Sequence, residues 1–249
     1  MTEPHTRLSV QGSVGPLSLH FEAEFSAPWT ILFGPSGCGK STLLRAICGL
    51  GGKLSVHCAV ASQPGNIWTS LQDEGHSVPP EQRQLSYAPQ QAGLFPHLTV
   101  GENIAFAQKL RRGASPRPGL TENAIALFEL EPLLARRPQQ LSGGERQRVS
   151  LARALAVPDA RLVLLDEPFA GVDRALRDHL LAKVKAFLAD RQIPAISVTH
   201  DVDEAFLLGA EVIRLHAGRN TAQGPASRVL AAEAARTVEL LTPQRNLNP

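Results

Sequence analysis

The apolar positions change their spacing along the chain, and these changes predict where strands and helices lie. Between residues 7 and 33, short apolar runs alternate with glycine and proline, which predicts short strands joined by turns and an antiparallel β portion at the N-terminus. Apolar side chains then recur at helical spacing, and a glycine cluster ends this predicted helix. The helical positions are Leu43, Leu44, Ile47 and Leu50, and the glycines are Gly49, Gly51 and Gly52.

The middle of the chain is predicted to be mostly helical. Residues 53–80 are mixed and rich in turns, so no element is assigned there, whereas LSYA at 85–88 has the character of a short strand. From Gln90 to Ala156 the helical pattern dominates, and a segment rich in Arg, Pro and Gly at 111–119 predicts an exposed connection. We therefore expect an inserted α-helical subdomain at approximately residues 91–157.

Buried strands and helices are predicted to alternate in the last third of the chain. The predicted strands are RLVLLD, AISVTH and EVIRLH at 161–166, 195–200 and 211–216, and the helices between them are 174–190 and 201–208. This alternation predicts a parallel sheet covered on both faces. We expect one α/β domain of residues 1–249 with a mixed, largely parallel sheet, and a polar tail at 243–249 that frays.

Composition narrows the class of protein and its partners. Hydrophobic residues make up 43% and charged residues 19% of the chain, as in a globular protein. The net charge of +2 is balanced, so nucleic acid is not expected as a partner. Cys38, Cys48 and Cys58 are odd in number and lack the close pairing of zinc ligands, so neither a disulfide framework nor a zinc site is predicted. Neither a secretory signal nor an apolar run of roughly 18–20 residues occurs, so we expect a cytoplasmic chain whose membrane role depends on a partner.

A glycine-rich segment between a predicted strand and a predicted helix suits a phosphate group. It follows the pattern of a glycine, four residues, then glycine, lysine and serine. Backbone N–H groups of such a loop form an anion nest, and the following helix adds the partial positive charge of its N-terminus. Lys40 is expected to reach the β- and γ-phosphates of a nucleoside triphosphate and Ser41 to bind Mg²⁺, whereas a glycine-rich turn with an accidental lysine is the alternative. The predicted binding residues are Gly34, Pro35, Ser36, Gly37, Cys38, Gly39, Lys40, Ser41 and Thr42.

Two carboxylates follow the buried strand LVLLD at 162–166. Asp166 is expected at the carboxyl edge of the parallel sheet, where ligands of this architecture lie, and there it would hold Mg²⁺ directly or through water. Glu167 could polarise a water molecule toward the γ-phosphate as a general base. A solvated strand end is the alternative reading of this pair. With the phosphate loop, these residues predict a P-loop NTPase core.

A second exposed helix N-terminus is predicted at LSGGERQRVSLARAL, residues 141–155. One phosphate loop needs no second anion site for the same triphosphate, but two facing chains would use one. We expect Ser142, Gly143 and Gly144 of one copy to close over the γ-phosphate held by Lys40 of a second copy, so that the nucleotide joins a head-to-tail dimer.

Four segments together resemble the ATP-binding subunits of ABC transporters. GPSGCGKST, LSGGERQR, LVLLDEP and SVTHD occur in that family's order, and the resemblance spans residues 31–204. It implies ATP and Mg²⁺ as ligands and a second copy or a homologous ATPase subunit as a partner. It also implies that Gln90 belongs to the Q-loop, which senses Mg²⁺ and the membrane subunit, that Asp173 belongs to the D-loop, and that His200 is the switch histidine near the γ-phosphate.

The segment LFPHLTVGENIAF at 94–106 resembles the part of importer-type subunits that receives the coupling helix of a membrane protein. Packing of the helical subdomain is the alternative explanation of its apolar residues. Neighbouring segments are most similar to ATPases of molybdate and related oxyanion importers. This resemblance implies integral-membrane permease subunits, indirectly an extracytoplasmic solute-binding protein, and a peripheral location at the cytoplasmic face of the membrane.

Three features depart from the family's pattern. Residues 8–16 contain no aromatic residue to stack on adenine, and Phe21, Phe25 and Trp29 suit the core equally well. The D-loop reads AGVD instead of the commoner SALD. The segment after His200 is too short for the C-terminal regulatory domain that molybdate-type subunits usually carry.

Two other functions are compatible with such a cassette. A non-transport member could clamp on a ribosome or on DNA, but the former usually carry two cassettes in one chain and the latter long coiled-coil or zinc insertions, which this sequence lacks. An export-type ATPase is the other alternative, although exporter cassettes are often fused to membrane spans. The sequence favours an ATPase that energises import of a small solute.

Overall fold

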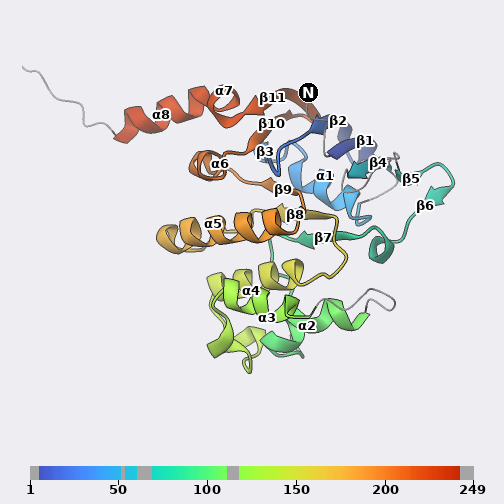
Figure 1. Ribbon diagram of the computed structural model, residues 1–249. Helices are drawn as coiled ribbons and strands as arrows, with labels where there is room; N and C mark the ends of the chain where they lie inside the picture. The colour runs from blue at the N-terminus through green and yellow to red at the C-terminus, as the bar shows by residue number, and fades with distance from the viewer. Residues whose placement is uncertain (1–5, 52–53, 61–68, 111–117, 242–249) are drawn as a thin grey trace, which may run out of the picture.

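The computed structural model describes residues 6–51, 54–60, 69–110 and 118–241 (Figure 1). The tail predicted at 243–249 and most of the connection predicted at 111–119 lie outside the described residues. Over the described part, the fold is α/β, with one mixed sheet and helices packed against it, as the sequence predicts.

One 11-stranded sheet runs through the molecule in the order β6-β5-β4-β1-β2-β11-β10-β3-β9-β8-β7. Strands β7, β8, β9, β3 and β10 are parallel to one another, and β6, β5, β4, β1 and β2 form an antiparallel ladder. The strands are β1 (Thr6–Val14), β2 (Leu17–Phe25), β3 (Trp29–Phe33), β4 (Leu54–Val60), β5 (Thr69–Asp73), β6 (His76–Ser77), β7 (Leu85–Ala88), β8 (Leu162–Asp166), β9 (Ala195–Val198), β10 (Glu211–His216) and β11 (Arg219–Pro225).

The antiparallel portion differs from the expectation in two ways. The turn-rich segment to which no element is assigned contributes β4, β5 and β6, so the antiparallel ladder is longer than the apolar pattern indicates. Strand β3 does not continue the β1–β2 hairpin, because it pairs in parallel with β10 and β9. Its first four residues are all buried, which is typical of a strand covered on both faces.

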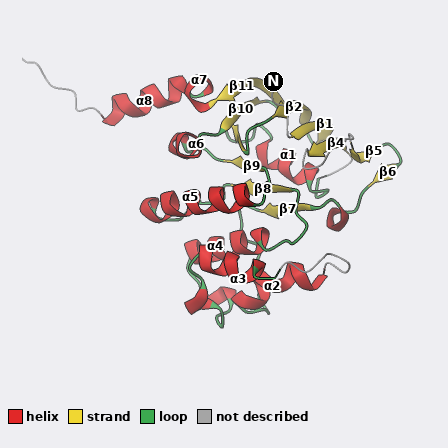
Figure 2. Ribbon diagram, viewed as in Figure 1, coloured by secondary structure: helices red, strands yellow, loops and turns green. Residues whose placement is uncertain are grey.

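The helices cover both sides of the sheet and form a separate region below β7 (Figure 2). That lower region contains the three helices α2, α3 and α4. The helices are α1 (Lys40–Ile47), α2 (Val100–Leu110), α3 (Leu120–Leu127), α4 (Gly143–Leu155), α5 (Arg174–Asp190), α6 (Val202–Leu208), α7 (Ala226–Val229) and α8 (Ala231–Leu241), with short 3-10 turns at Pro80–Gln82, Glu131–Leu133 and Pro138–Gln140.

The helix boundaries follow the predicted pattern closely, but the prediction is wrong for one side chain, that of Leu50. Helix α5 has the predicted bounds. Helix α1 ends at Ile47, before Leu50, and Leu50 is 54% exposed rather than part of the helical core face. The glycine at position 49, with φ of 77°, turns the chain away from the helix axis, so the next leucine leaves the buried face.

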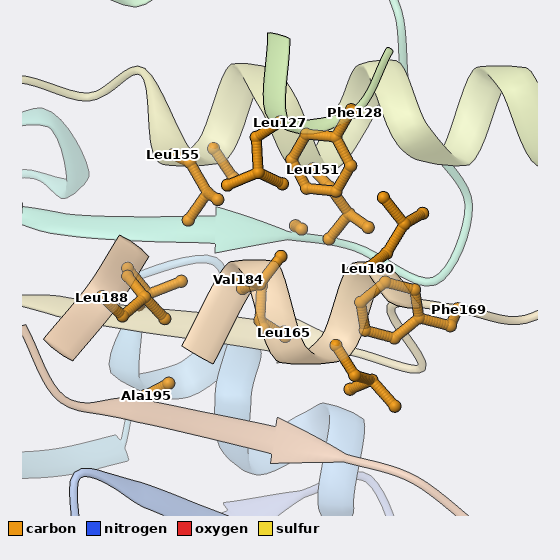
Figure 3. Packing of buried hydrophobic residues seen from close by; sticks show 14 of the residues in the cluster. Leu127, Phe128, Leu151, Leu155, Leu165, Phe169, Leu180, Val184, Leu188 and Ala195 are labelled. Atoms are coloured by element: carbon orange, nitrogen blue, oxygen red, sulfur yellow. The ribbon is translucent and has the colours of Figure 1, made fainter. Parts of the chain in front are cut away.

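Two hydrophobic clusters lie on opposite faces of the sheet. One contains side chains of α1 together with β1, β2 and β4. The other joins α3 and α4 to α5 and β8, and Figure 3 shows Phe128 and Leu151 facing Leu180 and Phe169 across it. Because the helical region shares this core with the sheet, its position is fixed relative to the strands. Over the described segments, no helix is both long and apolar enough to cross a bilayer.

Candidate active site

The glycine-rich loop lies between β3 and α1, as predicted. Gly34 tolerates no side chain, because a Cβ there would lie 2.2 Å from the carbonyl oxygen of Leu215 on β10. Gly37 and Gly39 have φ of 77° and 108°, a region that favours glycine. Pro35 and Ser36 are exposed, whereas the Cys38 side chain points into the core and is buried. The side chain of Cys38 is therefore shielded from solvent within the loop.

Lys40 is held by the loop itself. Its ammonium group donates to the carbonyl oxygens of Gly34 at 2.7 Å and Pro35 at 2.9 Å. The same nitrogen lies 3.9 Å from the sulfur of Cys38. A positive charge thus sits inside the curve of the loop, next to the N-terminus of α1, and the combination is suited to an anion.

Ser41 and Asp166 bring the loop and β8 together. The Ser41 hydroxyl donates a hydrogen bond of 2.9 Å to Oδ1 of Asp166, and the Tyr87 hydroxyl donates one of 3.3 Å to Oδ2. Burial raises the pKa of the Asp166 carboxyl, and these two hydrogen bonds partly offset that effect. Burial also raises the pKa of Tyr87. A hydroxyl beside a carboxylate offers two hard oxygen ligands, and this combination suits Mg²⁺.

The described residues contain no group of three or more His, Cys, Asp or Glu side chains able to hold a metal ion. A Mg²⁺ ion shared with phosphate oxygens needs no such group, because it is typically bound through one or two protein side chains. The donor chemistry of Ser41 and Asp166 therefore remains compatible with Mg²⁺.

Glu167 lies between two other predicted site residues, Gln90 and His200. Its Oε2 accepts a hydrogen bond of 3.0 Å from Nε2 of Gln90, and its Oε1 lies 3.7 Å from Nδ1 of His200. Its backbone has φ of 47°, which is uncommon for a residue with a side chain and stores strain. The amide of Glu167 donates to the carbonyl oxygen of Val198 at 3.0 Å, which fixes this turn against β9.

Ser142 caps the N-terminus of α4, and its amide and hydroxyl both form hydrogen bonds with Glu145 in the first turn of that helix. Its hydroxyl accepts from the amide of Glu145 at 3.2 Å, and the Glu145 carboxylate accepts from the amide of Ser142 at 2.7 Å. Figure 1 places α4 in the lower helical region and α1 near β1 and β4. Within one chain, therefore, α4 and α1 do not lie side by side.

The two adjacent glycines after Ser142 differ in their surroundings. A Cβ on Gly144 would lie 3.3 Å from the carbonyl oxygen of Gly171, so this glycine permits close contact with the segment before α5. A Cβ on Gly143 would meet nothing within 4 Å in the part of the chain that the structure describes. Asp173 caps α5, where its carboxylate accepts from the amides of Ala175 and Leu176. The fold of one chain explains Gly144 and Asp173 but not Gly143.

The sequence pattern missed Tyr87. Tyr87 pairs with Leu164 of β8, two residues before Asp166, so its hydroxyl can reach the carboxylate. A signal was present, because a strand that ends two residues before Gln90 is expected beside the strand that ends at Asp166 if both supply one site. The apolar pattern alone does not identify which strands are neighbours.

The loop that follows Gln90 is also organised by residues that the sequence pattern did not single out. Asn103 is fully buried, accepts from the amide of Phe95 at 2.8 Å and donates to the carbonyl oxygens of Phe95, Leu98 and Thr99. Arg153 of α4 donates to the carbonyl oxygens of Ala92 and Gly93, each at 3.0 Å. These contacts order the segment between Gln90 and α2.

A glycine loop ahead of a helix, with a strand-end carboxylate bonded to its serine, defines a P-loop nucleotide-binding protein. The family described as ABC transporter matches residues 19–170. The chain therefore belongs to the ABC transporter family.

Relatives with a more specific name are similar to most of the chain. Molybdenum import ATP-binding protein ModC of Rhodopseudomonas palustris (strain HaA2) is 40% identical over 220 residues, which cover 86% of this chain and 56% of that protein. The protein of the same name from Aromatoleum aromaticum is 44% identical over 202 residues, covering 80% of this chain and 52% of that protein. The chain spans about half the length of the curated relatives it matches.

Solved structures share the fold. A dimeric bacterial ABC transporter cassette has a TM-score of 0.70 and 24% identity, over 89% of this chain and 98% of that chain. A bacterial ABC exporter with ATP bound has a TM-score of 0.71 and 25% identity, over 98% of this chain and 43% of that chain. These likenesses support the mixed α/β architecture described above.

Proposed function

We propose that the chain binds and hydrolyses ATP, closes as a dimer around it, and energises import of molybdate or a related oxyanion through separate permease subunits. The observation that carries this proposal is the 2.9 Å hydrogen bond between Ser41 and Asp166. It joins an anion-binding loop to a buried carboxylate, so that phosphate and Mg²⁺ ligands converge at one edge of the sheet.

The loop of residues 34–42 would hold the phosphates of ATP. Lys40 would exchange the carbonyl oxygens of Gly34 and Pro35 for the β- and γ-phosphate oxygens. The backbone amides and the N-terminus of α1 would supply further positive potential. On binding, Lys40 would therefore exchange its hydrogen bonds to the loop for hydrogen bonds to phosphate. The free energy of binding is the difference between the two sets of hydrogen bonds.

Ser41 and Asp166, with Gln90 nearby, would hold Mg²⁺. When bound, the ion would neutralise negative charge on the phosphates during transfer. Tyr87 orients the Asp166 carboxylate by occupying its second oxygen. The chain thus supplies an oriented pair of oxygen donors rather than a closed metal cage.

Glu167 would act as the general base for the attacking water. Gln90 and His200 contact its two carboxylate oxygens, so both side chains can sense its position. His200 is largely exposed and would be free to contact the γ-phosphate. The strained backbone of Glu167 is consistent with a residue held in place for a task other than folding.

A second copy would complete the site. Gly143 is exposed and leaves open space, whereas Gly144 is explained by its contact with Gly171. Since no neighbour among the described residues crowds a side chain at position 143, its missing side chain favours close approach of a partner's nucleotide. Ser142, already fixed by its capping contacts with Glu145, would present the N-terminus of α4 to that nucleotide.

Import of an oxyanion rests on the similarity to relatives that are named as molybdenum import ATP-binding proteins. The ordered segment after Gln90 would receive a permease at the cytoplasmic face of the membrane. Phe95 and Phe106 form an aromatic pair there, with ring centroids 4.3 Å apart. An extracytoplasmic binding protein would deliver the solute to the permease.

The decisive test combines turnover with assembly. Glu167→Gln should retain ATP binding and form a stable dimer with ATP and Mg²⁺, while turnover falls by about 10²–10⁴-fold, as for loss of a general base. Light scattering of the variant measures assembly, and phosphate release measures turnover. A variant that stays monomeric alone and with its permease refutes the dimer, and unchanged turnover refutes the role of Glu167.

The solute requires a separate test. The chain and its permease should take up molybdate into vesicles when ATP is supplied on the side that carries the ATPase, with tungstate and sulfate as competing oxyanions. If vesicles take up neither molybdate, tungstate nor sulfate when each is supplied alone, the oxyanion assignment is wrong, while the assignment of ATP hydrolysis is unaffected.

A further inference from the structure

Arg177 joins the first turn of α5 to the loop that carries His200. Its Nη1 donates to Oδ2 of Asp201, and its Nε donates to Oδ1 of Asp178 at 3.0 Å. The same Nε lies 4.0 Å from the carboxylate of Glu204 on α6. One guanidinium thus faces carboxylates from α5, from the start of α6 and from its interior.

Burial makes this contact more than a surface ion pair. The Arg177 side chain is 11% exposed, and that of Glu204 is 8% exposed. Burial raises the pKa of Glu204, and a hydrogen bond with Thr199 partly offsets this effect. Within the described residues, Nη2 of Arg177 is buried and has no hydrogen-bond partner. The guanidinium therefore holds an unused donor, a costly arrangement that a small movement of a nearby carboxylate could relieve.

His200 depends on its neighbours in sequence for its position. Its side chain is 79% exposed, and its Nδ1 lies 3.7 Å from Oε1 of Glu167. By contrast, both flanking residues are anchored: Thr199 accepts from the amide of Asp201 at 3.0 Å, and Asp201 accepts from the amide of Asp203 at 2.8 Å. We define residues 199–201 as the switch loop.

We propose that Arg177 is a positioning residue for His200, coupling the first turn of α5 to the switch loop. The proposal rests on the proposed function, in which His200 contacts the γ-phosphate. The turn that Arg177 occupies begins at Asp173, whose carbonyl oxygen accepts from the amide of Arg177 at 2.8 Å. A shift of the Asp173 segment on contact with a second copy is thereby transmitted to the loop that holds His200.

A neighbouring pair supplies a matched comparison. Arg174 contacts Asp203, so it also joins the first turn of α5 to α6, but its side chain is 72% exposed. An exposed ion pair does little to fix the position of its two side chains, because water competes for both charged groups. If the coupling is specific, Arg177 and Arg174 will differ in their effects although they connect the same two helices.

The kinetic test is a double-mutant cycle with His200. Arg177→Gln should lower kcat for ATP by about ten- to a hundredfold, the loss expected for a hydrogen bond to a charged group, and leave KM nearly unchanged. In a His200→Ala background the same substitution should cause no further loss. Arg174→Gln should change kcat by less than about threefold, in line with an exposed pair. Equal losses from Arg177→Gln with and without His200 would overturn the proposal.

A second readout does not require turnover. Hydrogen exchange of the amides of Asp201 and Asp203 should become faster in Arg177→Gln and stay unchanged in Arg174→Gln. Asp201→Asn keeps a side chain that can cap α6, so it should fold and give a smaller loss of kcat in the same direction. If the wild-type chain hydrolyses no ATP, the proposed function fails. If it does and these amides exchange as before, the coupling through Arg177 fails.

Discussion

Ser41 donates a hydrogen bond of 2.9 Å to Asp166 across 125 positions of sequence. This contact connects the first turn of α1 to the end of β8, two elements that the chain separates by the whole helical region. It requires β8 to be a near neighbour of β3, and β9 alone lies between them in the sheet. The pairing of loop and carboxylate is therefore a product of sheet order.

Tyr87 should tune this contact without being essential. Tyr87→Phe removes the hydroxyl that occupies the second oxygen of Asp166 and keeps the ring in the core. We expect the Mg²⁺ concentration needed for half-maximal turnover to rise by about tenfold, the lower end of the effect of a residue that orients a metal ligand. Magnesium titration of phosphate release measures it. An unchanged Mg²⁺ requirement would show that Ser41 alone orients the carboxylate.

Lys40→Ala should weaken nucleotide binding. The substitution removes an ammonium that would contact phosphate oxygens, and we expect the Kd for ATP to rise by about ten- to a hundredfold, as for charge-assisted hydrogen bonds. Calorimetry without turnover measures this. Arg45→Ala, in the last turn of the same helix, serves as a control that removes an exposed cation outside the loop. Equal affinity for ATP in Lys40→Ala and the wild type would contradict the role of Lys40.

Gly143→Asp should have opposite effects on the monomer and the dimer. An acidic residue in the first turn of α4 interacts favourably with the helix N-terminus, and its Cβ enters open space, so thermal stability should hold or rise slightly. The same charge would repel a partner's γ-phosphate, so ATP-dependent dimerisation of a Glu167→Gln background should be lost. Gly143→Asp chains that still dimerise would exclude this face from the interface.

Arg83 should be important for stability rather than turnover. It is buried, and it donates to four backbone carbonyl oxygens and the side chain of Gln72. The carbonyl groups belong to Ala46, Ile47, Leu71 and Val78. Arg83→Ala removes this buried donor from all five acceptors, although the amides of Gly49 and Val78 still donate to the carbonyl oxygens of Ala46 and Leu71. The loss should cost about 3 kcal/mol in the free energy of unfolding. Urea unfolding measures it, and exposed Arg219→Ala should change it by less than about 0.5 kcal/mol.

Glu233 links stability to pH through Arg214. Hydrogen bonds from the Arg214 guanidinium lower the pKa of Glu233, with donor distances of 2.7 and 2.9 Å. Because the folded pKa lies below the unfolded one, this stability is complete above the unfolded pKa of about 4.3 and is lost as pH falls through the folded pKa. Glu233→Gln should therefore cost about 1 kcal/mol at neutral pH and nothing in strong acid. Unfolding midpoints that differ equally at both pH values would contradict this linkage.

Much of the fold follows from local pattern. The helix at 174–190 and the strand ending at Asp166 are predictable because their apolar periods are long and their boundaries carry a cap or a charge. Strands β4, β5 and β6 are not, because they are short and partly exposed, and they depend on pairing with β1 rather than on their own pattern. Helices α7 and α8 were also not predicted, although Arg214 of β10 contacts Glu233 on α8.

The residues of the site also fall into two groups, those that local sequence predicts and those that depend on the tertiary structure. Residues of the glycine loop and the strand-end acids are predictable from spacing, since their chemistry is encoded within a few adjacent positions. Tyr87 and Arg177 depend on which elements are neighbours in space, and no local pattern specifies that. The strained backbone of Glu167 is likewise set by tertiary structure, because its amide bonds to Val198 of the next strand.

Through the hydrogen bonds of Arg153 to Ala92 and Gly93, helix α4 connects the segment after Gln90 to the exposed glycine at its own N-terminus. Its 13 residues span about 20 Å at 1.5 Å per residue. Arg153 lies in its last turn and Gly143 in its first. A displacement of the segment after Gln90 would therefore reach the end of α4 that carries Gly143 through the helix itself, without any need for the helix to unwind.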